Sequence, residues 1–327
     1  MNKLRVAAVQ LEHKAGDKAA NLEKIEHFAG LAAAAGAQAV AFPECCISSY
    51  MHLAGLNYAQ LCDLAEEIPG GAAIQRLQKI ARAQRIHVLA GLLEIDRGPG
   101  GGLYNSYAAV SPQGAVVSYR KLHPFVNKHL KAGSQYVLWE LEGWKAGILI
   151  CYDCNLWENW RVLELRGAQI IFCPHQTGAF DIPCAGMGKI PVELWLNRQR
   201  DPEPIRKEIT GPKGLAWVKK WLPSRAYDTG TCVVFANGVG IDGDEVRTGG
   251  SMIINPHGIV LAETSALGDD LAVAELDPKD LELNLGASHT AARRPELYGP
   301  LVEGAGLQVD TREKRDAIRR KLGVELK

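Results

Sequence analysis

Short apolar runs alternate with segments of helical spacing along the first part of the chain. An apolar run at 4–11 is followed by apolar positions three or four apart over 17–36, and then by a second apolar run at 39–44. Runs of four to eight apolar residues bounded by turn residues are typical of buried strands, whereas the wider spacing predicts a helix that buries one face. A helix over 72–83 and a strand over 87–93 complete the predicted order strand, helix, strand, helix, strand.

Hairpins break this order in both halves of the chain. The turns Ser111-Pro112-Gln113-Gly114 and Asn255-Pro256-His257-Gly258 each join two apolar runs, which indicates antiparallel neighbours. The remaining strands are expected at 104–110, 115–119, 136–139, 144–150, 169–173, 232–236, 251–254, 259–262 and 271–276, with a helix over 156–166. No internal repeat is apparent in the sequence. The pattern predicts an α/β fold, a four-layer αββα sandwich of two mixed β-sheets flanked by helices.

The chain is expected to form a single domain over residues 1–327, because no linker divides it. Residues 180–223 interrupt the alternation and are rich in proline, with a helix expected near 215–221. A stretch of this length inside a compact domain is usually a lid or a partner surface, so we predict an insertion here. A tail is expected from about residue 300, and its Lys/Arg-rich run 312–321 alternates with acids, which predicts a solvated helix face.

The composition is that of an ordinary globular protein. Hydrophobic residues make up 47% and charged residues 23%, and the formal net charge is zero, so neither nucleic acid nor an anionic membrane is expected as a partner. The N-terminus lacks a signal-peptide core and no segment approaches the length of a membrane span, so we expect a cytoplasmic protein. The eight cysteines are too widely spread for a disulfide scaffold and are expected to be reduced.

Ionisable residues end three of the predicted strands. Pro43 stops one apolar run directly before Glu44, Lys121 ends another, and Cys151 comes directly after a third. We expect these side chains to meet in one cleft. A neutral thiol is a poor nucleophile, so Cys151 needs a base, and Glu44 can accept its proton. Lys121 and the backbone N–H of Tyr152 can stabilise the negative charge that develops when a thiolate attacks a carbonyl or nitrile carbon.

Other residues close to these strand ends are candidates for substrate binding. Glu158 is close enough to Cys151 in the chain to lie at the rim of the pocket, although an acid in the first turn of a helix also has a structural role. His175 stands at a strand end, where it can line the cleft. Lys128 belongs to a basic cluster after Lys121 that can receive an anionic group of the substrate.

Two other chemistries would use the same cysteine. Cys151 and Cys154 have the spacing of a redox dithiol or a metal-binding pair, but there is only one such pair, and thioredoxin-like sites normally open a helix in a smaller unit. The second alternative is a papain-like enzyme in which His123 or His175 activates the thiol. Replacement of Glu44 by Gln distinguishes the two mechanisms. It should abolish turnover if Glu44 is the base and leave turnover largely intact in a papain-like enzyme.

With these motifs in this order, the sequence resembles the nitrilase superfamily of carbon–nitrogen hydrolases. The segments that carry the resemblance, besides the three strand ends, are 6–10, 104–106, 167–168 and 251–258. The resemblance implies that Glu44 is a general base, that Lys121 stabilises the tetrahedral intermediate, and that Cys151 forms a thioester or thioimidate. Water then releases the acid, with ammonia or an amine as the other product.

The resemblance also implies a homodimer or larger homo-oligomer that needs no cofactor and no metal. The expected substrate is a small-molecule amide or N-carbamoyl compound, with a nitrile as the alternative. The pair Tyr152-Asp153 directly after Cys151 looks more like the sequence of the amidases in this family than that of its nitrilases. Many members carry a further glutamate between the lysine and the nucleophile strand, but residues 122–139 contain no acid. Either Glu94 or Glu158 takes that role, or the protein works without it.

Overall fold

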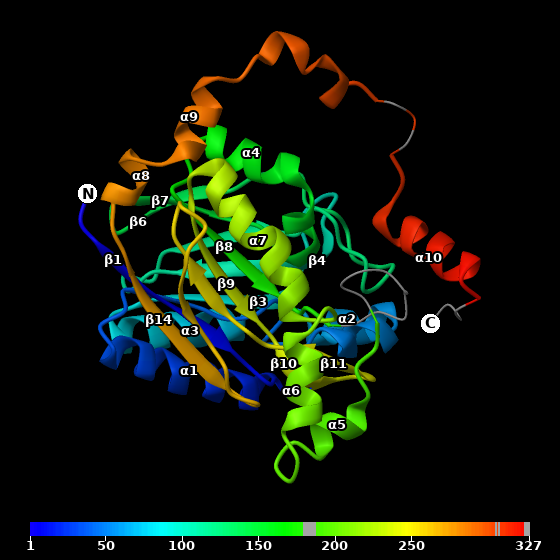
Figure 1. Cartoon of the computed structure of the whole chain (residues 1–327). Helices are drawn as coiled ribbons and strands as arrows, with labels where there is room; N and C mark the ends of the chain where they lie inside the picture. The colour runs from blue at the N-terminus through cyan, green and yellow to red at the C-terminus, as the bar shows by residue number, and fades with distance from the viewer. Residues whose placement is uncertain (179–187, 305, 307, 324–327) are drawn as a thin grey trace.

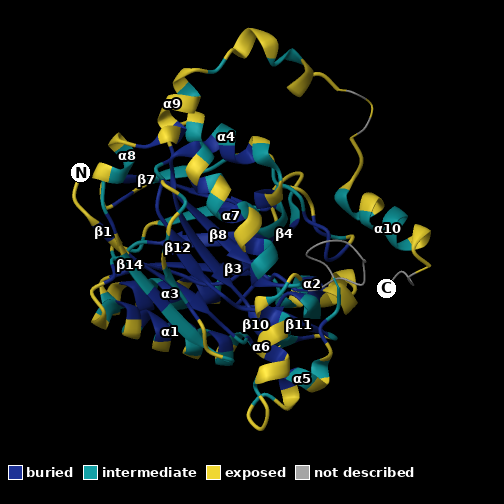
Figure 2. Cartoon of the chain, in the orientation of Figure 1, coloured by how far each residue is buried: buried dark blue, intermediate teal, exposed yellow. Residues whose placement is uncertain are grey.

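The structure of the protein is a computed structural model that describes residues 1–178, 188–304, 306 and 308–323. Two sheets of six strands pack face to face and helices cover both outer faces (Figure 1). Burial is greatest where the sheets meet each other and the helices (Figure 2). The predicted four-layer sandwich of two mixed sheets is therefore confirmed.

The first sheet has the strand order β14-β1-β2-β3-β4-β5. Its strands are β1 (Leu4–Gln10), β2 (Ala39–Ala41), β3 (His87–Asp96), β4 (Gly102–Val110), β5 (Val116–Arg120) and β14 (Asp270–Leu276). The strands β1, β2 and β3 are parallel, whereas β14, β4 and β5 run antiparallel to their neighbours. Helices α1 (Lys18–Ala34) and α3 (Ala72–Gln84) cover its outer face and bury apolar side chains there, among them Phe28 and Leu77.

The second sheet has the order β13-β12-β9-β8-β7-β6. Its strands are β6 (Leu138–Leu141), β7 (Trp144–Ile148), β8 (Ile170–His175), β9 (Cys232–Asn237), β12 (Met252–Ile254) and β13 (Val260–Glu263). Helices α4 (Trp157–Leu165) and α7 (Leu215–Thr229) cover its outer face. Large side chains such as Tyr107 from the first sheet and Trp144 from the second fill the space between the sheets.

Helix α7 runs further than the sequence predicts. The expected end near residue 221 is wrong, because the helix continues through Pro223 to Thr229. Leu222 and Ala226, on either side of the proline, are fully buried against the second sheet. Their packing offsets the hydrogen bond that a proline removes from a helix.

Several elements do not appear in the sequence-based prediction. They are the hairpin β10 (Val239–Asp242) and β11 (Glu245–Thr248), the helices α2 (Tyr58–Leu64), α5 (Val192–Leu196) and α6 (Glu203–Thr210), and the 3-10 helices η1 (Met51–Gly55) and η2 (Cys151–Asn155). The helices α5 and α6 lie within the predicted insertion. Whether 180–223 is an insertion into one domain stays a prediction.

The C-terminal part of the chain leaves the sandwich and returns to it (Figure 1). Its elements are α8 (Lys279–Glu282), α9 (Leu285–Ala291), η3 (Pro295–Leu297), η4 (Gly299–Leu301) and α10 (Thr311–Lys321). Helix α10 contains no buried residue, as its mixed charges predict. Among the described residues, none of the helices combines the length and apolar character needed to cross a bilayer.

Candidate active site

The structure brings together the three side chains that end predicted strands. Glu44 comes after β2, Lys121 after β5, and Cys151 opens η2 after β7. The Nζ atom of Lys121 lies 2.6 Å from Oε1 of Glu44, and both side chains are at most 1% exposed. Both groups act on the Cys151 thiol, since the negative charge of Glu44 raises its pKa and the charge of Lys121 lowers it. An acid, an ammonium group and a thiol therefore share one pocket.

The chain around Glu44 is held by the neighbouring strands β3 and β4. A Cβ atom on Gly91 of β3 would lie 2.3 Å from the backbone nitrogen of Cys45, so only glycine permits this approach. The hydroxyl of Tyr107 on β4 donates to the carbonyl of Phe42 at 2.6 Å. These contacts fix the backbone on both sides of Glu44.

Cys151 sits in a strained turn that a buried aspartate holds. Its φ is +49°, a left-handed conformation that residues other than glycine rarely adopt. The carboxylate of Asp153 accepts hydrogen bonds from the Tyr119 hydroxyl at 2.8 Å and from the backbone N–H of His123 at 2.9 Å. Asp153 thus ties the turn that carries Cys151 to the loop that begins at Lys121.

The Glu44 carboxylate has one occupied oxygen and one that remains available. Oε1 accepts from Lys121 and from Nδ2 of Asn105, at 2.6 and 2.7 Å. Oε2 is buried and has no hydrogen-bond partner among the described residues. An unpaired buried oxygen is costly unless a ligand or reacting group uses it, so Oε2 is the atom suited to accept a proton from Cys151 or from water.

The pKa values in this pocket keep the thiol neutral and the lysine charged. Burial, followed by the negative charge of Glu44, raises the pKa of Cys151 to about 12, against the opposing effects of Lys121 and the Gln176 backbone. Burial alone would lower the pKa of Lys121, but Glu44, with smaller effects from Tyr50 and other acids, outweighs it and raises the pKa. The thiol therefore needs a base at the moment of attack, and the ammonium is present throughout.

A second buried ionic cluster lies behind Glu44, and no sequence pattern indicated it as part of the site. The Gln176 side chain donates to the Glu44 carbonyl at 2.8 Å, and Arg247 on β11 donates to the Gln176 carbonyl at 2.9 Å. Arg247 also lies 3.0 Å from Asp242, whose other oxygen is 3.2 Å from His13. Burial would raise the pKa of Asp242, but Arg247 holds it below its ordinary value.

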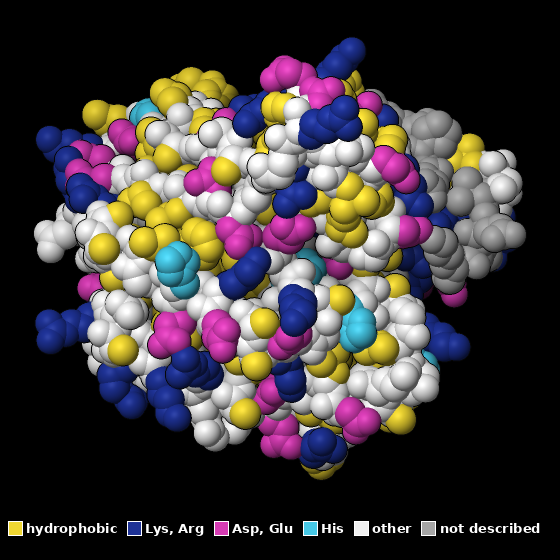
Figure 3. Space-filling model, turned by 90° about the horizontal axis from the view of Figure 1, so that it is seen from below, with side chains coloured by type: hydrophobic (Ala, Val, Ile, Leu, Met, Phe, Trp, Pro, Cys, Tyr) yellow, Lys and Arg dark blue, Asp and Glu magenta, His cyan; other side chains and the backbone are white. Residues whose placement is uncertain are grey.

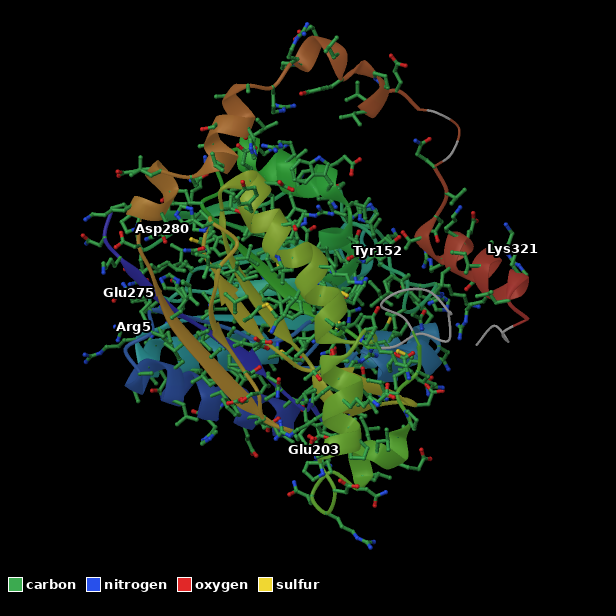
Figure 4. All side chains as sticks on the ribbon, in the orientation of Figure 1. Arg5, Tyr152, Glu203, Glu275, Asp280 and Lys321 are labelled. Atoms are coloured by element: carbon green, nitrogen blue, oxygen red, sulfur yellow. The ribbon has the colours of Figure 1, made fainter. Side chains whose placement is uncertain are left out.

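The predicted accessory residues take different positions. Tyr152 is partly exposed, packs edge-on against Phe125 with ring centroids 5.7 Å apart, and lies on the side of the body that faces α10 (Figure 4). Lys128 is exposed and lines an open cavity of about 780 Å³ beside α10. Glu158 is exposed in the first turn of α4, where an acid suits the helix dipole. Substrate contacts of these residues stay predictions.

His175 belongs to the outer face of the second sheet. Its ring lies 4.7 Å from that of Phe235 and 5.9 Å from that of Trp221 on α7. Its Nδ1 pairs with the hydroxyl of Thr177 at 3.2 Å. The other histidine considered for a papain-like pairing, His123, has its Nδ1 2.9 Å from Asp153. The described contacts of both histidines are thus with residues other than Cys151.

Glu94, one candidate for the additional glutamate, already has partners of its own. Glu94 on β3 is buried and pairs with Arg120 at 2.5 Å and with the hydroxyl of Ser106 at 2.5 Å. The negative charge of Glu94 is therefore balanced by Arg120, the residue directly before Lys121. A polar contact to the Glu44–Lys121 pair comes from Asn105, which lies in the segment 104–106 that carries the family resemblance but was not predicted as a site residue.

The Cys151-Cys154 spacing does not place two thiols side by side in the pocket. Cys154 is fully buried in the cluster between the second sheet and its helices, with its sulfur 3.3 Å from the Leu149 carbonyl. Cys151 packs against the cluster between the sheets. Within the described ranges, no group of three or more potential metal ligands is found.

This fold and pocket define a class of α/β sandwich hydrolases with a cysteine nucleophile. A family model described as carbon-nitrogen hydrolase matches residues 5–283. The chain therefore belongs to the carbon–nitrogen hydrolase family, and its predicted membership of the nitrilase superfamily, on the amidase-like branch, is confirmed.

Named relatives and a solved structure agree with this assignment. The chain is 29% identical to an (R)-stereoselective amidase of Pseudomonas sp., over 90% of each chain. It is 27% identical to the human omega-amidase NIT2, over 91% of this chain and 98% of that one, and 26% identical to a nitrilase of Pyrococcus abyssi, over 84% and 90%. A solved structure of the NitN amidase from Nesterenkonia sp. AN1 has a TM-score of 0.68 at 25% identity, over 91% of this chain and all of that one.

Proposed function

We propose that the protein hydrolyses the carbon–nitrogen bond of a small-molecule amide or N-carbamoyl compound through a thioester on Cys151. The convergence of Glu44, Lys121 and Cys151 carries this proposal. Amidases among the relatives, including the human omega-amidase, support the amide class.

In the first half of the reaction, Oε2 of Glu44 takes the thiol proton while the sulfur attacks the carbonyl carbon. Negative charge then develops on the carbonyl oxygen, where the Lys121 ammonium and the Tyr152 backbone N–H stabilise it. The proton held by Glu44 passes to the departing nitrogen as the C–N bond breaks. An acyl thioester remains on Cys151.

In the second half, Glu44 takes a proton from water, which attacks the thioester carbon. The C–S bond breaks, the carboxylic acid leaves, and the proton returns to the sulfur. Asn105 and Lys121 hold Glu44 in place for both steps through its other oxygen. One base thus serves both halves.

A nitrile substrate is the second candidate, because a relative from Pyrococcus abyssi is named a nitrilase. The same residues would then form a thioimidate. A panel of amides, N-carbamoyl compounds and nitriles, scored by ammonia release, separates these classes. Cys151→Ala is the control, and hydrolysis that persists in this variant would overturn the proposal, as would failure of every compound with the wild type.

We also propose a cytoplasmic homo-oligomer that acts on small molecules and does not bind nucleic acid. Leu283, Leu301 and Val302 in the C-terminal part are 64–87% exposed, and a second copy of the chain can cover such side chains. Acidic and basic side chains are interspersed on the face drawn in Figure 3, which does not favour a polyanion. Light scattering coupled to gel filtration measures the oligomeric state, and a monomer at micromolar concentration would contradict it.

A further inference from the structure

Gln176 lies directly after β8, one residue beyond the histidine that the sequence predicted as a site residue. Successive side chains along a strand point to opposite faces of the sheet. The ring of His175 packs against aromatic rings on the outer face of the second sheet. Gln176 turns the other way, is only 3% exposed, and reaches Glu44 with its side chain.

One contact joins the side chain of Gln176 to the main chain at Glu44. Nε2 of Gln176 donates to the Glu44 carbonyl at 2.8 Å. A carbonyl oxygen only accepts hydrogen bonds, so the amide nitrogen must lie at this end of the side chain. Its second hydrogen can go to Nδ1 of His13, 3.3 Å away. Gln176 therefore holds the backbone of Glu44, whereas Lys121 and Asn105 hold its carboxylate.

Gln176 is itself fixed on two sides. Arg247 donates to its carbonyl at 2.9 Å. A Cβ atom on Gly238 would lie 1.9 Å from Oε1 of Gln176, so the glycine leaves the space that the amide fills. Arg247 also donates to Asp242 at 3.0 Å, and the Asp242 carboxylate accepts from the backbone N–H of Met51 at 3.1 Å. One buried cluster therefore holds both Gln176 and the segment that follows β2.

The backbone of Gln176 also acts on the nucleophile. Burial and then the charge of Glu44 raise the pKa of the Cys151 thiol, and the backbone N–H of Gln176 works in the opposite direction. An N–H group lowers the pKa of a thiol because it stabilises the thiolate. Gln176 therefore touches both partners of the proton transfer, the base through its side chain and the nucleophile through its backbone.

We propose that Gln176 is a positioning residue of the hydrolase, whose side-chain amide holds the main chain of Glu44 where Oε2 can take the proton of Cys151. The inference rests on the proposed amide hydrolysis and adds a residue to the three expected from the sequence. Without an N–H donor at this position, the Glu44 carbonyl loses its partner and the base can move. A displacement of about 1 Å in a reacting group can cost about a hundredfold in rate.

The first experiment separates catalysis from substrate binding. Gln176→Met keeps the length of the side chain and removes its donor. We expect kcat for an amide to fall at least about tenfold while KM changes less than about twofold, because the substituted side chain orients the base. A change in KM alone, or an unchanged kcat, would overturn the proposal.

Gln10→Met is the matched control. Gln10 is 1% exposed, and its amide also donates to backbone carbonyls, but these lie in the loop before β14. At an equal folded fraction, measured by urea denaturation, it should keep kcat within about twofold of the wild type. A loss of kcat equal to that of Gln176→Met would show that only packing was disturbed.

A double variant tests whether Gln176 acts through Glu44. In Glu44→Gln the base is already absent, so adding Gln176→Met should lower kcat/KM less than about twofold further. Losses that multiply would contradict the proposal, because Gln176 would then act independently of Glu44.

Alkylation of Cys151 by iodoacetamide needs no substrate, so it decides the role of Gln176 even if no amide is hydrolysed and the proposed function fails. When the Glu44 carboxylate is no longer held in place, its charge should raise the pKa of the thiol less. The midpoint of the alkylation profile should then move to lower pH in Gln176→Met, but not in Gln10→Met. An unchanged midpoint in Gln176→Met would refute the role. Gln176→Leu also lacks the donor and replaces Gln176→Met if that variant does not fold.

Discussion

The two sheets share one plan. Counted from β14 to β5 in one sheet and from β6 to β13 in the other, neighbouring strands pair antiparallel, parallel, parallel, antiparallel and antiparallel. Helices α1 and α4 occupy equivalent places, as do α3 and α7. The turns at 111–114 and 255–258 close equivalent hairpins. This repeat of topology was not apparent in the sequence.

The two halves differ in the residues that come at the ends of the equivalent strands β2 and β8. Pro43 and Pro174 each stand two residues beyond the last position paired with β1 or β7, and the next residues are Glu44 and His175. Glu44 meets Lys121 and Asn105, whereas His175 meets aromatic rings. The same backbone plan therefore brings a side chain to equivalent strand ends, and the neighbouring elements give it a lysine and an amide as partners in one half and aromatic rings in the other.

The largest expected effect comes from replacing these two equivalent residues in turn. Glu44→Gln removes the base and should lower kcat/KM by about 10³-fold or more. His175→Asn, at the equivalent position, should leave most of the activity, because its described contacts are structural. Steady-state kinetics on one amide, with circular dichroism as a folding check, measures both. A papain-like mechanism would show the reverse order.

A second comparison sets a buried arginine against an exposed one. Arg247 is 1% exposed and balances Asp242 and Glu245. Arg247→Met leaves both acids buried without this partner, so it should lower the free energy of unfolding by about 3–5 kcal/mol. Urea denaturation at pH 7 measures this change, and a loss below about 1 kcal/mol, the value of an exposed pair, would show that the cluster does not hold the site.

The pH dependence of Cys151 alkylation tests how Glu44 acts on the thiol. The pKa of about 12 lies above the ordinary 9.0, so the thiol stays protonated through neutral pH and alkylation by iodoacetamide should rise only in strongly alkaline solution. Glu44→Gln removes a negative charge that raises this pKa and leaves Lys121, which lowers it. The midpoint of the alkylation profile, read by peptide mass mapping, should therefore move to lower pH, and an upward shift would contradict this electrostatic role of Glu44.

The smallest effect is expected at the edge of the first sheet. Arg5 on β1 faces Glu275 on β14 at 3.2 Å, and the two side chains are 45% and 38% exposed (Figure 4). Water and salt screen such a pair, so Arg5→Ala should cost less than about 1 kcal/mol in the same urea experiment. If Arg5→Ala lowered the free energy of unfolding as much as Arg247→Met does, burial would not explain the difference expected between the two arginines.

Much of the sandwich could be predicted from the sequence, because apolar runs and the prolines that follow them indicate where strands end. Pro43 before Glu44 and the apolar run before Cys151 locate the site residues from local pattern alone. Contacts such as Asn105 to Glu44 join residues on different strands, and no local pattern encodes them. The β10–β11 hairpin did have a signal, Gly243-Asp244, a glycine-containing pair that suits the two-residue turn between the paired Asp242 and Glu245. Helix α10 could be expected as a helix, but its position beside the loop after Lys121 depends on bonds that Arg312 and Arg315 donate to the carbonyls of Asn127 and Phe125.

The separate placement of α10 has a consequence for how such a protein can change over time. Glu44, Lys121 and Cys151 follow the ends of strands in the sandwich, and the backbone beside Glu44 packs so closely that Gly91 has no room for a side chain. Helix α10 has no buried residue and contributes Arg319 to a cavity wall from outside the sandwich. Substitutions in residues 311–321 can therefore reshape the cavities that α10 lines while the buried groups around Glu44 keep their positions.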